Sequence, residues 1–483
     1  MNIDDILKGI NVISLTGNKV DITDISFDSR NVKSGSLFVA VKGVKSDGHD
    51  FIEKAVMTGA SAIMCSKVPE NLSSGTCIIK VADPAEALGI AASNFYGNPS
   101  GKLKLVGVTG TNGKTTIATL LYRTFTKLGN KCGLFSTVCN YINERELPAT
   151  HTTPDPVQLN RLMAEMVAEG CSHAFMEVSS HSVDQKRIAG LMFSGGIFTN
   201  LTHDHLDYHK TFDNYLVAKK GFFDTLSSSA FALVNADDRN GKVMLQNCRA
   251  THYTFSVRSY ADFRCTILER GFEGMKLKMQ GEEVWTRFVG DYNASNLLAV
   301  YGAAELLGAS SRDILTILSD LHPVAGRLEI IKSDQGITGI VDYAHTPDAL
   351  VNVLETLNRS KKPGIKLITV VGAGGDRDKT KRPKMAAISA EASDKVILTS
   401  DNPRTENPES ILDDMETGIT PELKKKTLRI SDRREAIRTA VMLASKGDVI
   451  LVAGKGHETY QEVNGVRHHF DDREVLRDVF SGK

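Results

Sequence analysis

The sequence predicts an α/β protein built from three domains. A chain of 483 residues has room for about three domains that each bury a core of their own. From about residue 101 onward, short β-branched apolar runs alternate with helical patterns, which is typical of parallel sheets with crossover helices. Several of these runs lead directly into polar or glycine-rich loops. Because ligands of open α/β sheets bind beyond the carboxyl ends of the strands, we expect a site where two such domains face each other.

Two clusters of turn-forming residues mark the expected domain limits. The first covers residues 94–104 and reads NFYGNPSGKLK, and the second covers residues 322–327 and reads HPVAGR. They divide the chain into residues 1–100, 101–323 and 324–483. The sequence contains no internal repeat and no low-complexity tract.

The expected strands and loops of the two larger segments follow in order. In the second segment, strands at 103–108, 173–178 and 195–200 precede the loops TGTNGKTT, SSHSVDQKR and LTHDHLDYH. In the third, strands at 366–371, 395–400 and 449–452 precede GAGGDRDKTKRP, DNPR and AGKGHE. These six loops are therefore the predicted lining of the site.

Charge and composition exclude several classes of protein. Lys and Arg together number 58, as do Asp and Glu, so the formal net charge is zero and no general basic field attracts nucleic acid or an anionic membrane. A hydrophobic content of 41% with 24% charged residues argues against a disordered, collagen-like or coiled-coil chain. The seven cysteines include no Cys-x-x-Cys pair and are expected to be reduced packing residues.

The same composition points to a cytoplasmic protein. No stretch approaches the ~20 apolar residues of a transmembrane segment. Asp4 and Asp5 stand where a secretory signal would carry Lys or Arg, and the start lacks a sustained apolar core.

A phosphate-binding loop is predicted between the first strand of the second segment and the helix after it. Residues 107–116 read GVTGTNGKTT. The helix has its apolar positions on one face and ends near a glycine: Ile117, Leu120, Leu121, Phe125 and Gly129. Glycines let backbone amides face the phosphates, Lys114 can reach the terminal phosphates, and the Thr115 hydroxyl can bind Mg²⁺. Val108 replaces the first glycine of the strict motif, and an ordinary strand-to-helix turn is the alternative.

Glu177 and His205 each lie just past an expected buried strand, near this loop. A carboxylate and an imidazole there are candidate ligands for a divalent ion, since phosphoryl transfer needs its developing charge neutralised. The run from Thr202 to His209, THDHLDYH, also resembles a transition-metal site, although a nucleotide loop favours Mg²⁺. The alternative is that Glu177 and His205 are loop residues with satisfied hydrogen bonds.

In the third segment, Arg377, Asn402 and Arg404 stand at strand ends. Guanidinium groups bind carboxylates in a bidentate way, so these loops suit an amino acid or another carboxylated substrate. The alternative is that both arginines pair with neighbouring aspartates. The turn DYAHTPD at 342–348 places a carboxylate and the imidazole of His345 near the expected nucleotide, with helix capping as the other interpretation of Asp348.

These motifs, in their order along the chain, resemble those of the Mur ligases. The resemblance begins at DSRNVKSGSLFVAVKG near the start and covers nearly the whole chain. The motifs are GTNGKTT, EVSSH, NLTHDHLDYH, the two asparagines of GDYNASN, AGR at 325–327, DYAHTPD, GGDRDKTKRP, DNPR and GKGHE. The resemblance implies three domains. The N-terminal one is a smaller α/β domain that binds a uridine nucleotide. The central one is a P-loop-type domain with a mostly parallel sheet flanked by helices, and the C-terminal one is Rossmann-like and binds an amino acid.

The implied activity is ATP-dependent amide ligation through an acyl phosphate, in cytoplasmic peptidoglycan precursor synthesis. In this family DNPR, with Arg404, goes with the addition of meso-diaminopimelate to UDP-N-acetylmuramoyl-L-alanyl-D-glutamate. The implied cofactor is Mg²⁺, the partners are these small molecules and ATP, and a monomer without nucleic acid is expected. L-lysine or L-ornithine as the added amino acid, another amide ligase of the superfamily, a P-loop NTPase regulator and a nucleotide-binding scaffold are the alternatives.

The resemblance also assigns residues to each ligand. For ATP they are Gly110, Thr111, Asn112, Gly113, Lys114, Thr115, Thr116, Asn293, Asn296, Arg327 and His345. For the UDP-N-acetylmuramoyl-dipeptide they are Phe27, Ser29, Val44, Lys45, Ser46, His151, Thr152, Thr153, Ser179, Gln185 and Arg187, with His151 standing where an Asn can occur. For the amino acid they are Arg377, Asp401, Asn402, Pro403, Arg404, Gly454 and Glu458. The implied catalytic residues are Lys114, Glu177, His205 and Lys219, and the last three join Thr115 as metal ligands.

The family also carries a lysine that CO₂ carbamylates. Tyr215-Leu-Val-Ala-Lys219-Lys220 matches its Y-x-x-A-K pattern, which implies N6-carboxylysine at Lys219 rather than Lys220. From the residues alone, an unmodified lysine at this position is expected to lie on an exposed helix face.

Overall fold

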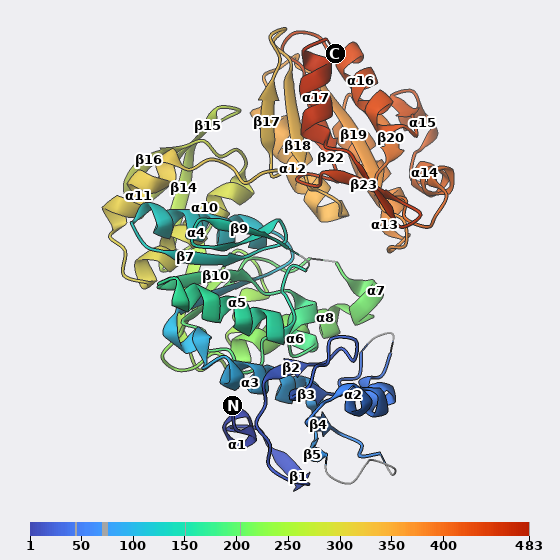
Figure 1. Cartoon of the computed structure of the whole chain (residues 1–483). Coiled ribbons are helices and arrows are strands. Elements are labelled where there is room, and N and C mark those ends of the chain that lie inside the picture. Colours follow the sequence, from blue (N-terminus) through green and yellow to red (C-terminus); the bar gives the residue numbers. More distant parts are fainter. Residues whose placement is uncertain (44–45, 70–75, 150, 203, 483) are drawn as a thin grey trace.

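Three α/β units follow one another along the chain (Figure 1). The computed structural model describes residues 1–43, 46–69, 76–149, 151–202 and 204–482. The predicted three-domain α/β fold is confirmed. The limits 1–100, 101–323 and 324–483 fall between the three main sheets, and we retain them as proposed domain boundaries.

The first unit has a five-stranded sheet in the order β1-β5-β4-β3-β2. Its strands are β1 (Val12–Thr16), β2 (Asp24–Ser26), β3 (Ser36–Val39), β4 (Ala62–Cys65) and β5 (Cys77–Val81), and its α-helices are α1 (Ile3–Ile6), α2 (Ile52–Thr58) and α3 (Pro84–Phe95). Strand β1 pairs antiparallel with β5, whereas the other pairs are parallel. Helix α3 packs against α5 (Pro156–Ala168) of the second unit, which joins the two units.

The second unit has an eleven-stranded sheet in the order β16-β15-β14-β13-β12-β11-β6-β10-β7-β8-β9. The strands at its centre are parallel, and they are β6 (Lys104–Thr109), β7 (Cys132–Phe135), β10 (His173–Glu177), β11 (Gly195–Phe198), β12 (Phe231–Asn235) and β13 (Thr251–Ser256). The outer strands add antiparallel pairs at both edges, and they are β8 (Cys139–Ile142), β9 (Arg145–Pro148), β14 (Phe263–Gly271), β15 (Gly274–Met279) and β16 (Glu282–Thr286).

Helices cover both faces of this central sheet. They are α4 (Lys114–Lys127), α5 (Pro156–Ala168), α6 (Ser180–Asp184), α7 (Leu206–His209), α8 (Phe212–Asp224), α9 (Gly241–Met244), α10 (Asp291–Leu306) and α11 (Ser311–Asp320). Val106 and Val108 of β6 pack in a core cluster with α4 and α10, whereas Leu105 packs in a second cluster with α5 and α8. Alternate residues of the strand therefore enter different cores, which is why the predicted strand is continuously apolar.

The third unit has a six-stranded sheet in the order β17-β18-β22-β19-β20-β21. Its strands are β17 (Glu329–Lys332), β18 (Thr338–Asp342), β19 (Leu367–Ala373), β20 (Lys395–Ser400), β21 (Thr427–Arg429) and β22 (Val449–Ala453), and a separate hairpin pairs β23 (Tyr460–Val463) with β24 (Val466–His469). Its helices are α12 (Pro347–Ser360), α13 (Lys381–Ala392), α14 (Pro408–Glu416), α15 (Pro421–Lys424), α16 (Arg433–Leu443) and α17 (Asp472–Phe480). Only β17 pairs antiparallel in the six-stranded sheet.

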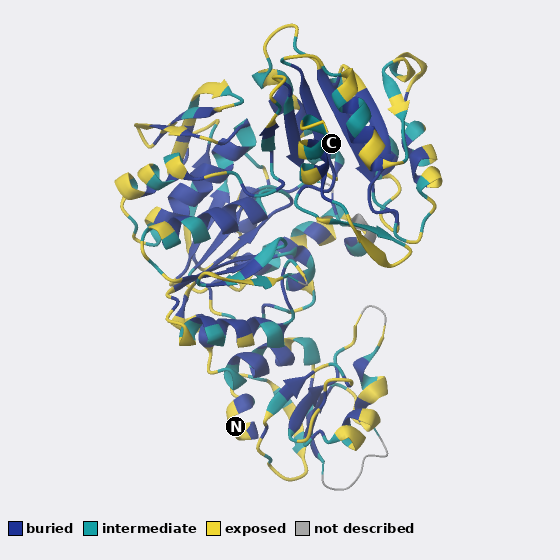
Figure 2. Cartoon of the chain, turned by 45° about the horizontal axis from the view of Figure 1, so that its top comes forward, coloured by how far each residue is buried: buried dark blue, intermediate teal, exposed yellow. Residues whose placement is uncertain are grey.

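The six strands predicted to carry the site loops are β6, β10, β11, β19, β20 and β22. Each is present, and its boundaries agree with the prediction within two residues. Figure 2 shows these strands as a buried interior, with exposed residues concentrated on the outer sides of helices and in loops.

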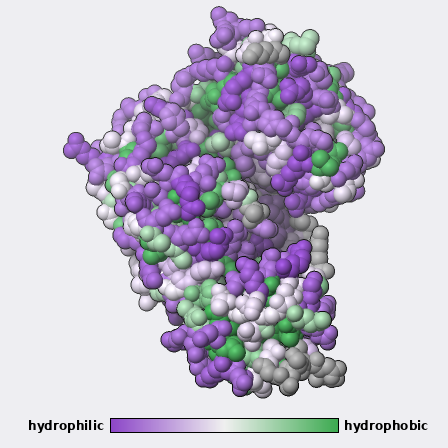
Figure 3. All heavy atoms as spheres, in the orientation of Figure 1, coloured by the Kyte–Doolittle hydropathy of each residue, from purple (hydrophilic) through white to green (hydrophobic). Residues whose placement is uncertain are grey.

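The surface and the cysteines agree with the compositional analysis. In the view of Figure 3, hydrophilic residues dominate the surface and hydrophobic ones form small, separate patches. All seven cysteines are free thiols, and all but Cys139 are buried, as expected of packing residues. None of the helices in the described ranges combines the length and apolarity that crossing a membrane requires.

Candidate functional site

The strand-end loops of the second and third units meet. Lys381, at the start of α13, places its Nζ 2.7 Å from Oδ1 of Asp204, which lies in the loop between β11 and α7. Arg327, just before β17, places Nη2 3.5 Å from the Thr115 hydroxyl at the start of α4. One contact therefore reaches the start of α4 after the phosphate-binding loop, and the other reaches the loop between β11 and α7.

That loop has the backbone conformation that its glycines predict. Gly110 has a φ of +147° and Gly113 a φ of +91°. A Cβ on Gly110 would lie 1.9 Å from the Thr199 hydroxyl, and one on Gly113 would lie 2.6 Å from Oδ1 of Asn296. Both positions therefore require glycine for conformation and for space.

Two residues that follow β11 and one residue of α8 form hydrogen bonds with the middle of the phosphate-binding loop. The Thr199 hydroxyl donates to the Asn112 carbonyl at 2.6 Å, and Asn200 accepts from the Asn112 amide at 3.0 Å. The Thr111 hydroxyl lies 3.1 Å from that of Tyr215 on α8. The loop is thus preorganised by hydrogen bonds rather than by a ligand.

Two lysines donate to the same carbonyl of this loop. Nζ of Lys114 lies 2.9 Å from the Gly110 oxygen, and Nζ of Lys219 lies 2.7 Å from it. Burial lowers the pKa of Lys114, and burial together with the charge of Lys114 lowers the pKa of Lys219 well below its ordinary value. Burial and the neighbouring lysine therefore both disfavour the protonated form of Lys219.

The environment of Lys219 differs from the prediction. Its side chain is 1% exposed, so the expectation of an exposed helix position is wrong. The reason is that α8 packs on the central sheet with this side of the helix inward. Lys220, by contrast, forms an ion pair with Asp224 one turn further along α8, at 2.5 Å.

Glu177 and the loop after β11 flank the lysines. Glu177 is buried at the end of β10, and its Oε1 accepts from the Thr137 amide at 2.7 Å. Nε2 of His205 lies 3.4 Å from Oδ2 of Asp204, and desolvation together with the charges of Lys114, His181 and Lys219 lowers the pKa of His205, although Asp204 opposes this shift. Burial alone would raise the pKa of Asp204, but His205 and Lys381 lower it below its ordinary range.

The metal-ligand prediction concerns Thr115, Glu177, His205 and Lys219. Among the described residues, no group of three or more His, Cys, Asp or Glu side chains is arranged to hold a metal ion, and one histidine of THDHLDYH, at position 203, lies outside these residues. An unmodified Lys219 offers a cation no anionic oxygen, whereas a carbamate there would add anionic oxygens to the carboxylate of Glu177. Oxygen ligands of this kind fit Mg²⁺.

The residues assigned to the muramoyl-dipeptide form a second cluster beside Glu177. The Thr153 hydroxyl donates to the Glu177 carbonyl at 2.8 Å and accepts from the Ser179 amide at 3.2 Å. Arg187 donates to the Thr153 carbonyl at 2.8 Å and to the Gln185 side chain at 2.7 Å. The Thr152 hydroxyl bonds that of Thr137 at 3.0 Å, and His151 is exposed.

The residues assigned to the uridine nucleotide lie in the first unit. Ser29 is buried, whereas Phe27 and Ser46 are exposed. Val44 and Lys45 lie outside the described residues.

The remaining nucleotide residues come from α10 and the start of the third unit. Asn296 donates to Oδ1 of Asn293 at 3.1 Å, and Asn293 donates to the Val289 carbonyl at 2.8 Å. The guanidinium of Arg327 stacks 4.5 Å from the ring centre of Tyr343, next to His345. The side chain of Thr346, not that of Asp348, caps α12.

The loops after β19 and β20 hold the two arginines of the predicted amino-acid pocket. Nη1 of Arg404 donates to the Gly375 carbonyl at 2.6 Å, and the Arg404 backbone has a φ of +52°. Its amide donates to the Glu462 carbonyl on β23 at 3.0 Å. The ion pairs found among the described residues include neither Arg377 nor Arg404, and the arginine of this loop region that pairs with Glu406 is Arg382.

The other pocket residues meet at the ends of β20 and β22. Nδ2 of Asn402 donates to Oε2 of Glu458 at 2.8 Å. A Cβ on Gly454, which has a φ of +121°, would lie 2.6 Å from Oδ2 of Asp401. Pro403 is buried between Asn402 and Arg404.

Three residues at this site had no role in the sequence prediction, although each lies in a quoted motif. They are Asp204 in THDHLDYH, Lys381 in GGDRDKTKRP and Lys455 in GKGHE. Their importance arises from contacts between distant segments, which residue spacing does not show.

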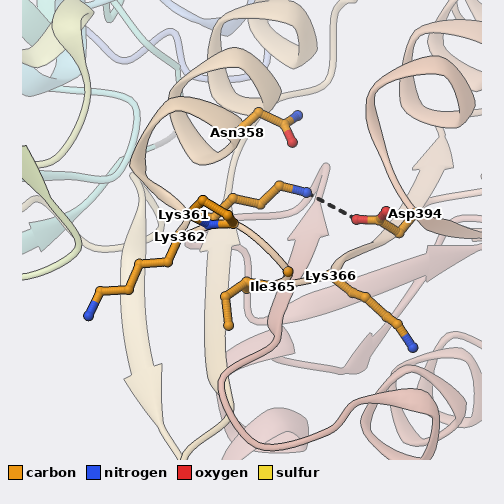
Figure 4. A pocket seen from close by; sticks show the side chains of 8 residues that line it. Asn358, Lys361, Lys362, Ile365, Lys366 and Asp394 are labelled. Atoms are coloured by element: carbon orange, nitrogen blue, oxygen red, sulfur yellow. Dashed lines mark hydrogen bonds and ion pairs between the residues drawn. The ribbon is translucent and has the colours of Figure 1, made fainter.

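A hollow of about 570 Å³ lies elsewhere in the third unit (Figure 4). It is lined by residues 361–366, Asn358 and Asp394, and it contains an ion pair of 3.0 Å between Lys361 and Asp394. It lies at the amino end of β19, opposite the strand ends that carry the site loops.

Comparisons with known proteins cover nearly the whole chain. Residues 21–96 match the family model "Mur ligase family, catalytic domain", 108–304 match "Mur ligase middle domain", and 326–456 match "Mur ligase, glutamate ligase domain". A relative from Bacteroides fragilis, named UDP-N-acetylmuramoyl-L-alanyl-D-glutamate--2,6-diaminopimelate ligase, is 60% identical and covers 100% of this chain and 99% of its own. The protein of the same name from Bacteroides thetaiotaomicron is 58% identical over 100% of both chains. A solved structure of a ligase with this name is 34% identical, covers 95% of both chains and has a TM-score of 0.68.

Proposed function

This chain belongs to the Mur ligase family, and we propose that it uses ATP to join meso-diaminopimelate to UDP-N-acetylmuramoyl-L-alanyl-D-glutamate in peptidoglycan precursor synthesis. Relatives that are 58–60% identical over the whole chain carry this activity in their names. The observation that carries the proposal is that the third unit contacts two loops of the second: Arg327 contacts Thr115 beside the phosphate-binding loop, and Lys381 contacts Asp204 in the loop after β11. A ligase needs this arrangement because ATP, an acyl donor and an amine must react at one place.

The first step activates a carboxylate. A terminal carboxylate oxygen of the dipeptide attacks the γ-phosphorus of ATP, the bond to the β-phosphate oxygen breaks, and an acyl phosphate and ADP result. Lys114 and the backbone amides at the N-terminus of α4 would stabilise the negative charge of the transferring group. Thr153, Ser179, Gln185 and Arg187 would hold the dipeptide beside them.

The second step forms the amide. The amine of the amino acid attacks the acyl carbon, a tetrahedral intermediate forms, and inorganic phosphate leaves as the nitrogen loses its proton. The loops after β19, β20 and β22 would position this amine at the carboxyl ends of their strands.

Lys219 would take part as a carbamate. An amine attacks CO₂ in its neutral form, which the burial of Lys219 favours by lowering its pKa, and the nitrogen loses a proton as the carbamate forms. With Thr115 and Glu177, and with His205 nearby, it would hold Mg²⁺, which supplies charge neutralisation for phosphoryl transfer when bound.

Arg404 supports diaminopimelate as the added amino acid. Its guanidinium is held at the pocket by Gly375 and by the β23–β24 hairpin, and no carboxylate of the described residues neutralises it. A second carboxylate on the substrate, which diaminopimelate has and lysine and ornithine lack, would supply the missing partner.

We place this activity in the cytoplasm and expect the chain to act as a monomer, since each proposed ligand is met by residues of one chain. Sedimentation equilibrium tests the second point. A dimer at micromolar concentration would contradict it.

The ligase proposal is tested by measuring phosphate release with ATP, the nucleotide-dipeptide and meso-diaminopimelate, leaving out one substrate at a time. Release that needs all three, with a product of the ligated mass, is expected. Release with ATP alone at an equal rate would instead indicate an NTPase regulator.

A further inference from the structure

A buried lysine lies beneath the proposed amino-acid pocket. Lys455 follows Gly454 at the end of β22, and its side chain is 0% exposed. Because no surface of this side chain is open, it cannot contact an amino acid in the pocket. The reaction steps above give it no part.

Lys455 bonds to two residues that are assigned to the pocket. Its Nζ donates to Oδ1 of Asn402 at 3.0 Å and to Oε2 of Glu458 at 3.2 Å. Nδ2 of Asn402 donates to the same Glu458 oxygen at 2.8 Å. The three side chains therefore form a closed triangle of hydrogen bonds.

This triangle fixes how the pocket residues are oriented. Oδ1 of Asn402 accepts from Lys455 and also from the Glu462 amide at 2.9 Å, so the amide group has one orientation. Its second N–H remains available as a donor for a carboxylate. Oε2 of Glu458 is held inside, while Oε1 lies 3.4 Å from the Tyr343 hydroxyl and remains available for an ammonium group.

Lys455 also places a positive charge between two carboxylates. Asp401 and Glu458 converge at this point, and Oδ1 of Asp401 lies 3.7 Å from the Lys455 Nζ. The Lys455 ammonium between these two carboxylates offsets their mutual repulsion at a place where little water screens it.

We propose that Lys455 is a positioning residue for the incoming amino acid. It offsets the charges of Asp401 and Glu458 and orients Glu458 and Asn402 toward the ammonium and carboxylate of one amino-acid centre. This inference rests on the proposed ligase function and goes beyond it, because it assigns recognition to a residue that the substrate does not touch.

The test is Lys455→Met, which keeps the apolar stem and removes the charge. We expect the KM for meso-diaminopimelate to rise ~10-fold or more, as when a buried hydrogen-bonded partner is removed, while the KM for ATP stays within ~2-fold. The matched control is Lys361→Met, which breaks a lysine–carboxylate pair in the same unit but at the hollow of Figure 4, and it should leave both constants unchanged. An unchanged KM for diaminopimelate, or an equal rise in both constants, would overturn the role of Lys455.

A double-mutant cycle keeps the test decisive if Lys455→Met folds poorly. Lys455→Met combined with Glu458→Gln removes one charge of each sign, and circular dichroism checks its fold. If Lys455 acts through Glu458, the rise in KM will be smaller than the product of the two single effects, and a rise equal to that product would contradict the inference. The wild-type enzyme tests the proposed function separately. If wild type releases no phosphate in response to diaminopimelate, the proposed ligase function is contradicted. If wild type is active but the two substitutions show no coupling, only the role of Lys455 is contradicted.

Discussion

We expect single residues to decide which amino acid the third unit accepts, and Arg404 is the first of them to test. Arg404→Ala should raise the KM for diaminopimelate ~30-fold or more with little change for ATP, because a charged hydrogen-bond partner is lost where the substrate carboxylate is expected. Steady-state kinetics with each substrate varied in turn measure this. Arg438→Ala is the control, since Arg438 pairs with Glu435 on the exposed face of α16. An unchanged KM for diaminopimelate in Arg404→Ala would contradict the assignment of Arg404 to the amino-acid pocket.

The adjacent lysines Lys219 and Lys220 allow the position of the carbamate to be tested. After incubation with ¹³C-bicarbonate, wild type should show a carbamate carbon signal by NMR. The signal should disappear in Lys219→Met and persist in Lys220→Met, because Lys220 pairs with Asp224 at the surface while Lys219 is buried beside Lys114. A signal that survives in Lys219→Met would assign the modification to another residue.

Some properties of single residues could be predicted from the sequence, and others could not. The glycines of the phosphate-binding loop and the arginines of the third unit could be predicted, because their chemistry is visible in short motifs. The burial of Lys219 and the contacts of Lys455 could not, since both depend on segments about 50 to over 100 positions apart.

At the scale of elements, the junction of β6 and α4 makes the clearest prediction. Gly110→Ala should weaken ATP binding ~10-fold or more, because its Cβ would lie 1.9 Å from the Thr199 hydroxyl in a loop that must stay open to phosphate. Isothermal titration calorimetry measures the change. Gly129→Ala, just beyond the other end of α4, also has a positive φ but no atom within 4 Å of the added Cβ. It should lower the free energy of unfolding by about 1 kcal/mol and leave ATP binding intact.

The strands were the most predictable elements. β6, β10, β11, β19, β20 and β22 are buried on both faces, so their apolar runs are continuous and their ends coincide with a change to polar residues. The antiparallel pairs at the two edges of the central sheet have mixed burial and had no comparable signal in the sequence.

For the whole molecule, the position of the third unit depends on a few contacts across the site. Lys381→Met should widen the distance distribution in small-angle X-ray scattering, because it removes the partner of the buried Asp204. Lys379→Met is the control, since Lys379 pairs with Glu406 inside the third unit. Superimposable scattering from Lys381→Met and wild type would show that this ion pair does not hold the units together.

The same pair has a defined pH dependence. The pKa of Asp204 is lowered in the folded protein, so its contribution to stability is complete above the ordinary value of 3.8 and is lost as the pH falls through the folded-state value. The scattering of wild type should therefore not change between pH 8 and pH 5 on account of this contact. An opening of the units within that range would contradict the assignment.

The central claim is that the whole molecule adds meso-diaminopimelate to a nucleotide-dipeptide, and parallel assays with three amines test it most directly. Phosphate release and product mass are measured with ATP, UDP-N-acetylmuramoyl-L-alanyl-D-glutamate and either meso-diaminopimelate, L-lysine or L-ornithine. We expect rapid phosphate release and a ligated product with meso-diaminopimelate, and little of either with L-lysine or L-ornithine. Ligation of lysine or ornithine in preference to diaminopimelate would contradict it.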